Sequence, residues 1–310
     1  MPFDGFSAAD FDAFEEKKWA SNAFNLERLE VKLKLTALGK ELQSILGQGL
    51  SDQEMGISAD RPSVFNQHRV NDLTLYFFRG PTARKPLGSI LDGAKSIAAN
   101  LLDPAPHHKH IIRALRISQV GVDFGLWLHK DAWVDWKNAQ ARAKAYGEME
   151  KLQQALDELP VELLFARGLG LAADGRFARE LDAVVLLEGF EAAQPWTFFG
   201  RRLGRDEEDV GQGALAAKIA DCLLALEPLH DYLAWTPEND HHQIKSALKE
   251  QKEKARKPIK ELRAGDEVRV LSGLASGRIA VVDSIARRGM VKVRLGQVVL
   301  NMKMEDLARP

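Results

Sequence analysis

Lysine and arginine side chains set the C-terminal part of this chain apart. Residues 241–310 carry 16 Lys/Arg against 8 Asp/Glu, residues 1–240 carry 27 against 36, and the whole chain has a formal net charge of −1. Clustered cations neutralise phosphates without reading bases, so the asymmetry predicts contact with the phosphates of RNA or DNA, or with an acidic protein surface. The side chains predicted to contact phosphates are Lys252, Lys254, Arg256, Lys257, Lys260, Arg269, Arg278, Arg287, Arg288, Lys292 and Arg294.

Two simpler roles for the same cations stay open. Outward-facing Lys and Arg keep a small β domain soluble and protect its strand edges, and a basic surface also suits a purely protein partner. From Thr236 onward the sequence contains no Phe, Trp or Tyr. Recognition of single-stranded bases by aromatic stacking is therefore disfavoured.

The first 240 residues offer two candidate catalytic segments. His129 ends an alternating apolar run, a position suited to general acid–base chemistry, although such a residue more commonly caps the strand or the next helix. The segment Arg201–Asp209 is arginine-rich and then acidic, so it could clamp an anion or hold Mg²⁺, but its composition favours a solvated loop. The alternative hypothesis is therefore an enzyme with its pocket near these two segments, acting on nucleic acid delivered by the basic region.

Other reactive side chains give weaker signals. His107, His108 and His110 lie in PAPHHKHII without cysteines or a ligand pattern, so we expect solvated loop histidines and predict no metal or cofactor. His230 and Asp231 are adjacent on a predicted helix and should not face each other. Phosphate-loop, GxSxG and HExxH motifs are absent. Cys222, the only cysteine, is predicted to be a buried apolar residue, which fits a reducing, cytoplasmic location.

Helices should position these residues in the N-terminal part. Ser7 and Asp10 stand in capping-box spacing, with Phe6 and Phe11 placed as a hydrophobic staple. The apolar face of a longer helix ending at Gly47 is predicted to be Leu26, Leu29, Leu33, Ala37, Leu38, Leu42 and Ile45. Further helices are predicted over 131–159, with Trp133 and Trp136 in the core, and over 213–235, the latter interrupted at Pro228.

Strands are grouped between these helices. We predict strands at 72–79 and 161–166, a possible strand at 183–190, and a hairpin that turns around Gln119. Hairpin-like succession favours an α+β body with a mainly antiparallel sheet flanked by helices. No apolar run approaches a membrane span and the first residues lack a signal-peptide pattern, so no membrane partner is expected.

The apolar period becomes two near the C-terminus. Val291 and Val293 share a face with Lys292 and Arg294 opposite, and turns recur at 273–277, 288–289 and 296–297. Four short strands and a final turn predict a small all-β barrel.

The C-terminal sequence resembles a KOW motif. Gly265-Asp266, Val268-Arg269-Val270, Ser272-Gly273 and Gly277 are similar to the SH3-like barrel of NusG-type transcription factors and certain ribosomal proteins, and VKVRLG…LNMKMEDL resembles a small barrel of some MutS-like endonucleases. The resemblance covers residues 261–310 and implies contact with nucleic acid, ribosome or RNA polymerase. Ala280 departs from it, because it stands where the family's most constant glycine would fall.

Three segments of the body carry a second resemblance. FDGFSAADFDAFEEKKW, FGLWLHKDAWVDW and PWTFFGRRLGRDEED resemble a family of uncharacterised bacterial α+β proteins, which implies a compact α+β fold and no particular reaction.

Taken together, the sequence predicts an acidic α+β domain over 1–240, a basic linker or helix over 241–260, and a KOW/SH3-like barrel over 261–310. The leading hypothesis is a cytoplasmic adaptor whose basic module contacts nucleic acid or a ribonucleoprotein while the body binds a protein partner. A third possibility, that the basic module serves the acidic body itself, stays open.

Overall fold

A computed structural model describes residues 3–91, 106–167, 176–188, 196–243, 262–271, 275, 278–285, 290–296 and 298–308. The chain divides into two compact units, of which the first takes Met1–Gly88 and Pro104–His242 and the second takes Ser89–Asp103 and Gln243–Pro310. Each unit contains one antiparallel sheet, and the first unit also contains α-helices. The fold is therefore α+β.

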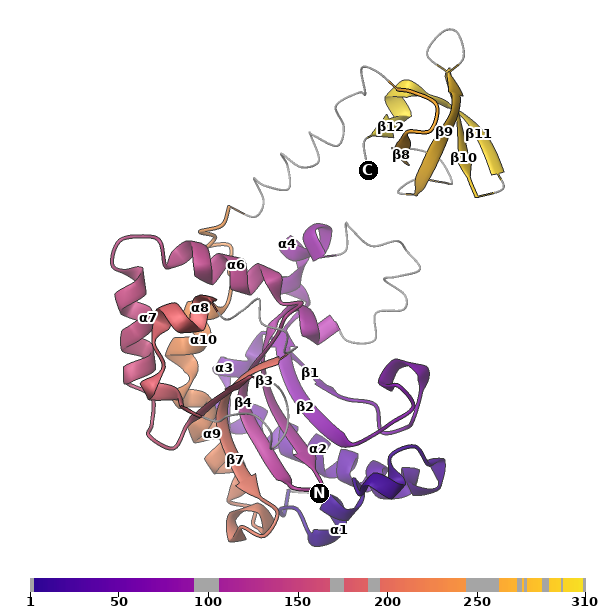
Figure 1. The fold of residues 1–310 in the computed structure, drawn as a ribbon. Helices are drawn as coiled ribbons and strands as arrows, with labels where there is room; N and C mark the ends of the chain where they lie inside the picture. The colour runs from indigo at the N-terminus through magenta and orange to yellow at the C-terminus, as the bar shows by residue number, and fades with distance from the viewer. Residues whose placement is uncertain are drawn as a thin grey trace. The chain divides into compact units, whose positions relative to one another are not determined.

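The first unit is built on a seven-stranded antiparallel sheet with strand order β1-β2-β3-β4-β7-β5-β6 (Figure 1). The strands are β1 (Gln53–Ile57), β2 (Asp72–Arg79), β3 (Ile111–Ser118), β4 (Gly121–His129), β5 (Leu164–Arg167), β6 (Arg176–Phe177) and β7 (Trp196–Gly204). β3 and β4 form the predicted hairpin, and the prediction for β2 matches its observed bounds. The prediction of a strand at 161–166 was displaced toward the N-terminus, because β5 begins only at Leu164.

β4 is buried on both faces of the sheet, although its apolar residues alternate along the chain in the pattern typical of a strand with one solvated face. Leu126 and Leu128 join the main core on the helical side, and Trp127 joins a second cluster on the opposite side. Gly125 pairs with Gly200 of β7 at a close approach of the strands, and it has φ 153°. A Cβ on Gly125 would lie 2.0 Å from the carbonyl oxygen of Phe199, so only glycine fits there.

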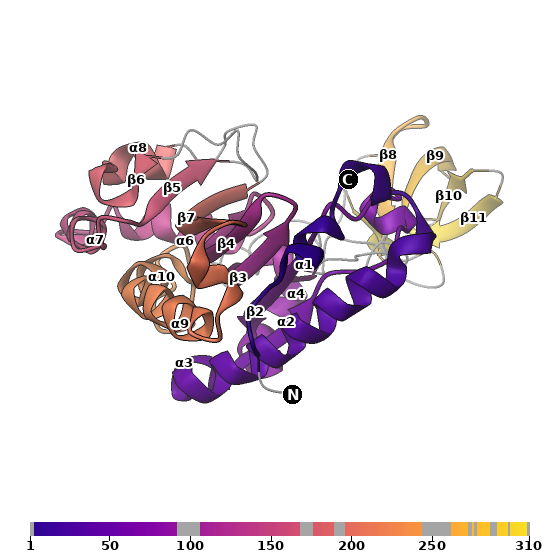
Figure 2. The ribbon, with the colours of Figure 1, turned by 90° about the horizontal axis from the view of Figure 1, so that it is seen from below.

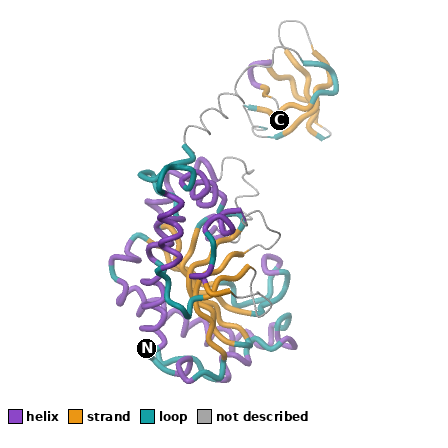
Figure 3. The backbone as a smooth tube through the Cα atoms, turned by 60° about the vertical axis from the view of Figure 1, so that its left-hand side comes forward, coloured by secondary structure: helices purple, strands orange, loops and turns teal. Residues whose placement is uncertain are grey.

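The helices α2 (Asn25–Leu46) and α9 (Leu215–Ala225) pack on one face of this sheet. α2 contacts β2, and α9 contacts β4 and β7, as the view from below shows (Figure 2). Figure 3 shows the strands of this unit as one twisted layer beside its helices. Among the described residues, no helix has both the length and the apolar character that a membrane crossing requires. The helices are α1 (Ala8–Asp12), α2 (Asn25–Leu46), α3 (Gln48–Ser51), α4 (Pro81–Leu91), α6 (Trp133–Arg142), α7 (Glu148–Asp157), α8 (Ala183–Glu188), α9 (Leu215–Ala225) and α10 (Glu227–Leu233).

The start of α1 is the predicted capping box. The Asp10 carboxylate accepts hydrogen bonds from the backbone N–H of Ser7 at 2.6 Å and from its hydroxyl at 2.8 Å. The rings of Phe6 and Phe11 meet edge to face, 6.3 Å between centroids, which is the predicted staple. Local sequence was sufficient here because every partner lies within five positions of the others.

The C-terminal end of α2 was predicted correctly, but its buried face only in part, because Leu38 and Leu42 are the buried leucines of the predicted face. The buried apolar side chains are Val31, Leu35, Leu38 and Leu42, whereas Leu26, Leu33 and Ile45 are exposed. The helix carries apolar residues nearly all round, so its own period does not decide which stripe faces the sheet.

Two predicted elements were wrong. The helix predicted over 131–159 is two helices, α6 and α7, separated by a turn that contains Gly147 with φ 75°. The possible strand at 183–190 is α8, because the Asp182 carboxylate accepts hydrogen bonds from the backbone N–H groups of Val184 and Val185 and starts a helix. A short apolar run of this kind suits either element from its sequence alone.

The second unit is a five-stranded antiparallel sheet with order β11-β10-β9-β8-β12, curled as Figure 1 shows. Its strands are β8 (Glu267–Val270), β9 (Ile279–Ile285), β10 (Met290–Leu295), β11 (Val298–Lys303) and β12 (Leu307–Ala308). The predicted final turn is a 3-10 turn at Met304–Asp306, which leads into the unpredicted β12. Ala280 is 1% exposed and pairs with Val268, so its methyl group is part of the core.

Candidate functional site

The sheet of the second unit turns cations outward. Along β10, Val291 and Val293 are buried in the core of the unit, whereas Lys292 and Arg294 are exposed. The alternation of a pleated strand places the two kinds of side chain on opposite faces, as the sequence predicts. Arg294 also forms an ion pair with Asp283 of β9, so Lys292 is the freer cation of the two.

The other predicted phosphate-contacting residues have different positions. Arg278 is exposed immediately before β9. Arg269 is half-buried on β8, and its Nε is buried without a hydrogen-bond partner. Outside the described residues lie Lys252, Lys254, Arg256, Lys257, Lys260, Arg287 and Arg288.

Exposed apolar side chains share the outer face with these cations. Ile279 is paired with Arg269, and Arg294 is flanked by Val281 on β9 and Val299 on β11. The three apolar side chains are between 41% and 51% exposed. Sequence reasoning missed them, although the run Ile279–Val282 gives apolar residues to both faces of one strand.

In the first unit, His129 and the arginines of Arg201–Asp209 do not form one pocket. His129 pairs with Trp196, and Arg202 pairs with Asp123, at the two ends of the β4–β7 ladder. The side chains share a face of the sheet, but six register positions separate them, which is about 20 Å. Groups that act on one reacting bond must lie within a few ångströms of it, so the two segments belong to separate environments.

His129 is buried and lies against Asp131 and His108. Its Nδ1 accepts a hydrogen bond from the backbone N–H of Asp131 at 3.2 Å, and its ring stacks on His108 with centroids 4.3 Å apart. Burial lowers the pKa of His129, and the carboxylate of Asp131 opposes this effect.

The prediction of solvated histidines at 107–110 was wrong. His107 and His110 are buried, and His107 stacks on Tyr76 with centroids 3.8 Å apart. Nδ1 of His110 lies 2.9 Å from the Arg79 guanidinium, which donates to it. Burial, aided by Arg79, lowers the pKa of His110 to about 3.

A buried carboxylate, Asp135, holds this corner of the unit together. It forms an ion pair with Arg79 and accepts hydrogen bonds from the backbone N–H groups of Ile111 at 2.9 Å and Trp235 at 2.8 Å. Arg79 also donates to the carbonyl oxygen of Trp235 at 2.8 Å. The interactions with Arg79 and the backbone keep the pKa of Asp135 below its ordinary value against the opposing effect of burial.

Only the acidic part of the segment Arg201–Asp209 is the solvated loop that its composition suggested, because Asp206, Glu207 and Glu208 are exposed after the end of β7. Arg202 lies within β7 and donates from Nε to Asp123 at 2.5 Å, and Asp123 also accepts from Arg116 of β3. Arg205 donates to Asp12 at 2.9 Å. The sequence signal for these ion pairs was the presence of charged residues inside otherwise apolar strands, because Arg and Asp are rarely buried unless they are paired.

α10 brings together a second charged cluster. Arg113 donates from Nη2 to Glu227 at 2.6 Å and lies 3.3 Å from Nδ1 of His230, which is also 3.3 Å from Asp231. The prediction that His230 and Asp231 stay apart was therefore wrong, because the side chains bend toward each other. Ligand atoms of Glu227, His230 and Asp231 lie within 4.8 Å of one another, but the Arg113 guanidinium already supplies the positive charge there.

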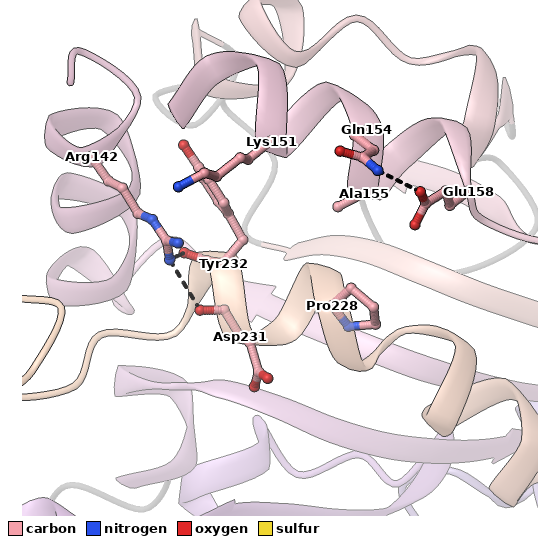
Figure 4. A pocket seen from close by; sticks show the side chains of 8 residues that line it. All are labelled: Arg142, Lys151, Gln154, Ala155, Glu158, Pro228, Asp231 and Tyr232. Carbon is pink, nitrogen blue, oxygen red and sulfur yellow. Dashed lines mark hydrogen bonds between the residues drawn. The ribbon is translucent and has the colours of Figure 1, made fainter. Parts of the chain in front are cut away.

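A shallow pocket lies where α10 faces α6 and α7 (Figure 4). Its volume is about 260 Å³, and the Arg142 guanidinium lies 4.3 Å from the centre of the Tyr232 ring. Arg142 donates to Glu148 at 2.5 Å and to the carbonyl oxygen of Asp231 at 3.3 Å. Arg142, the arginine of this pocket, is therefore already paired with groups of the protein itself.

Cys222 is a core residue, as predicted. Its thiol is buried and points to the carbonyl oxygen of Phe124 at 3.8 Å. Burial raises the pKa of Cys222 to about 12, so the thiolate needed for a nucleophile is not formed near neutral pH.

Comparisons with protein families and with curated proteins gave no match.

Proposed function

We propose that this protein is a two-domain adaptor that contacts nucleic acid, alone or within a ribonucleoprotein or transcription complex, through its basic C-terminal region. The observation that carries the proposal is the outer face of the second sheet, where Lys292 is exposed opposite buried valines, together with Arg278, which is exposed immediately before the neighbouring strand β9. The sequence of residues 241–310 also carries an excess of Lys/Arg over Asp/Glu. Such a surface attracts phosphates without selecting bases.

The resemblance to a KOW motif supports the same proposal. A curled five-stranded antiparallel sheet is compatible with a small barrel of the SH3-like kind. The outer face combines cations with exposed Ile279, Val281 and Val299 and has no aromatic ring. Backbone phosphates and protein surfaces of a ribonucleoprotein suit this face better than stacked bases do.

Fluorescence anisotropy with labelled RNA and DNA tests the proposal on the full chain. In the double variant Arg278→Glu, Lys292→Glu, we expect binding to weaken for all sequences alike. Each lost phosphate contact should also reduce the slope of log K against log salt by about 0.9 on duplex DNA, so two contacts give about 1.8.

The matched control reverses two exposed cations of the first unit, Lys40→Glu and Lys144→Glu, and changes the net charge by the same amount. It should bind almost as the unchanged chain does. Equal losses in both double variants would show that overall charge alone steers association, and unchanged binding by the first would remove this face from the proposal.

A further inference from the structure

The face of α2 that points away from the sheet leaves leucine side chains open to solvent. Leu26 is 75% exposed, Leu33 is 61% exposed, and Leu29 and Ala37 on the same face are half-buried. We call these four residues the outer stripe. Their spacing of three and four positions places them in one row about 17 Å long. Figure 2 shows α2 along the border of the first unit.

The outer stripe has the pattern of a seam between two helices. Single exposed leucines are ordinary on a protein surface, but apolar residues at i, i+3, i+7 and i+11 form the row that a second helix covers in a coiled coil. Of the large apolar side chains described on α-helices, Leu26 and Leu33 are the two most exposed. The core of the first unit does not use this row, because it takes the opposite stripe of α2. The row is therefore a docking surface for a helix.

Charges along one edge of the outer stripe indicate which helix fits it. Glu30 is exposed and has no ion-pair partner within the described part of the chain. Lys34 follows it by one helical turn, and its Nζ lies 2.7 Å from Asp10 while the side chain stays 31% exposed. An ammonium group has three donors, so Lys34 can bind a second carboxylate. An acid and a base on one edge are matched by a helix that presents the same two charges in reverse order.

A second copy of α2 running in the opposite direction meets this requirement. A two-fold axis across the pair brings each edge of the stripe against the same edge of the other copy. With Leu29 opposite Leu33 of the second copy, Leu26 lies opposite the small Ala37, and Glu30 lies beside Lys34 of the second copy. Every one of these contacts occurs twice by symmetry. In a parallel pair, Leu26 meets Leu26 and the Glu30 edge meets no base at its own height.

We propose that two copies of this chain associate through the outer stripes of α2, packed antiparallel. The stripe is short, and interfaces smaller than about 1,200 Å² are transient, so the dissociation constant should be on the order of 10–100 µM. This surface shares no residue with the proposed nucleic-acid face and goes beyond the proposed function.

Sedimentation velocity of the full chain from about 1 to 300 µM tests the proposal. The unchanged chain should shift from monomer to dimer across this range. Leu33→Glu places a carboxylate in the middle of the seam and should raise the dissociation constant at least about tenfold. The matched control is Tyr146→Glu, which makes the same charge change at a fully exposed side chain between α6 and α7 and should associate as the unchanged chain does. A chain that stays monomeric throughout, or equal association of the two variants, would overturn the proposal and leave the stripe to another partner.

A charge reversal tests the register. Glu30→Lys sets two lysines against each other on the same edge and should weaken association by about two- to tenfold, less so at high salt. Glu150→Lys on α7 changes the net charge equally at another exposed residue and should have no effect. Equal association of these two variants would show that Glu30 does not face Lys34 of the second copy.

Cross-linking tests the direction of the helices, because the only native thiol, Cys222, is buried. A mixture of Leu26→Cys and Ala37→Cys chains at about 200 µM should be joined by a short bismaleimide. Leu26→Cys alone should not, because the antiparallel pair holds its two thiols about 16 Å apart along the helix axis. Efficient cross-linking of Leu26→Cys with itself would show a parallel pair and overturn the antiparallel arrangement.

Discussion

Acid should destabilise the first unit through His110, and the structure sets the size of the effect. His110 is 2% exposed, and burial next to Arg79 lowers its pKa from 6.5 to about 3. The unfolded chain therefore takes up a proton as the pH falls through 6.5, while the folded chain does not until about pH 3. The contribution of His110 to the free energy of unfolding is therefore fully present above pH 6.5 and declines as the pH falls below it.

The expected loss follows from these two pKa values. At pH 5.0 protonation of this imidazole raises the unfolding equilibrium constant by a factor of about 30, whereas at pH 7.5 it raises it hardly at all. The free energy of unfolding therefore falls by about 2 kcal/mol between pH 7.5 and pH 5.0 because of His110. Asp135 does not titrate in this window, because its pKa is held below its ordinary acidic value. His129 and His230 also have lowered pKa values, but they are common to the protein and the variant compared below.

Urea unfolding followed by tryptophan fluorescence measures this loss for the first unit, because no tryptophan follows Trp235. In His110→Gln, whose amide oxygen can still accept from Arg79, the free energy of unfolding should fall by about 2 kcal/mol less between pH 7.5 and 5.0 than in the unchanged protein. His241→Gln changes an exposed histidine and should behave as the unchanged protein does. An equal loss in the protein and in His110→Gln would refute the reasoning.

Two further predictions concern the stability of the same unit and are measured by the same unfolding experiment. Asp135→Ala leaves the largely buried Arg79 without its carboxylate and should cost about 3–5 kcal/mol, whereas Glu54→Ala breaks a partly exposed pair and should cost less than about 1 kcal/mol. Similar costs for the two would contradict the role given to Asp135. Gly125→Ala places a methyl group against the Phe199 carbonyl and should cost more than about 2 kcal/mol, while Gly49→Ala in α3 meets no atom and should be neutral or stabilise by about 0.5–1 kcal/mol. A well-folded Gly125→Ala chain would show that β4 and β7 can separate without loss.

Features that depend on neighbours in sequence were predicted correctly. The capping box of Ser7 and Asp10 forms as expected, and the helical stretch near Pro228 divides into α9 and α10. The alternation of Val291 and Val293 with Lys292 and Arg294 likewise fixes which side of β10 is buried. In each case the interacting residues lie within a few positions of one another, so the local sequence decides the structure.

Features that depend on which distant residues pack against a segment were not predicted. The buried stripe of α2 and the helical state of 183–188 both depend on packing, because their apolar residues suit more than one arrangement. The histidines at 107–110 were expected in solvent, yet His110 is buried beside Arg79, thirty-one positions away in the chain.

The sequence by itself determined the α+β class, the separation of charge along the chain and the local turns and caps. Tertiary structure alone placed Asp135 between Arg79 and the backbone of Trp235 and separated His129 from Arg202. The physical reason is that burial and pairing of a charge require groups brought together from distant positions. Periodicity reports only the face on which a residue lies and not the group that it meets there.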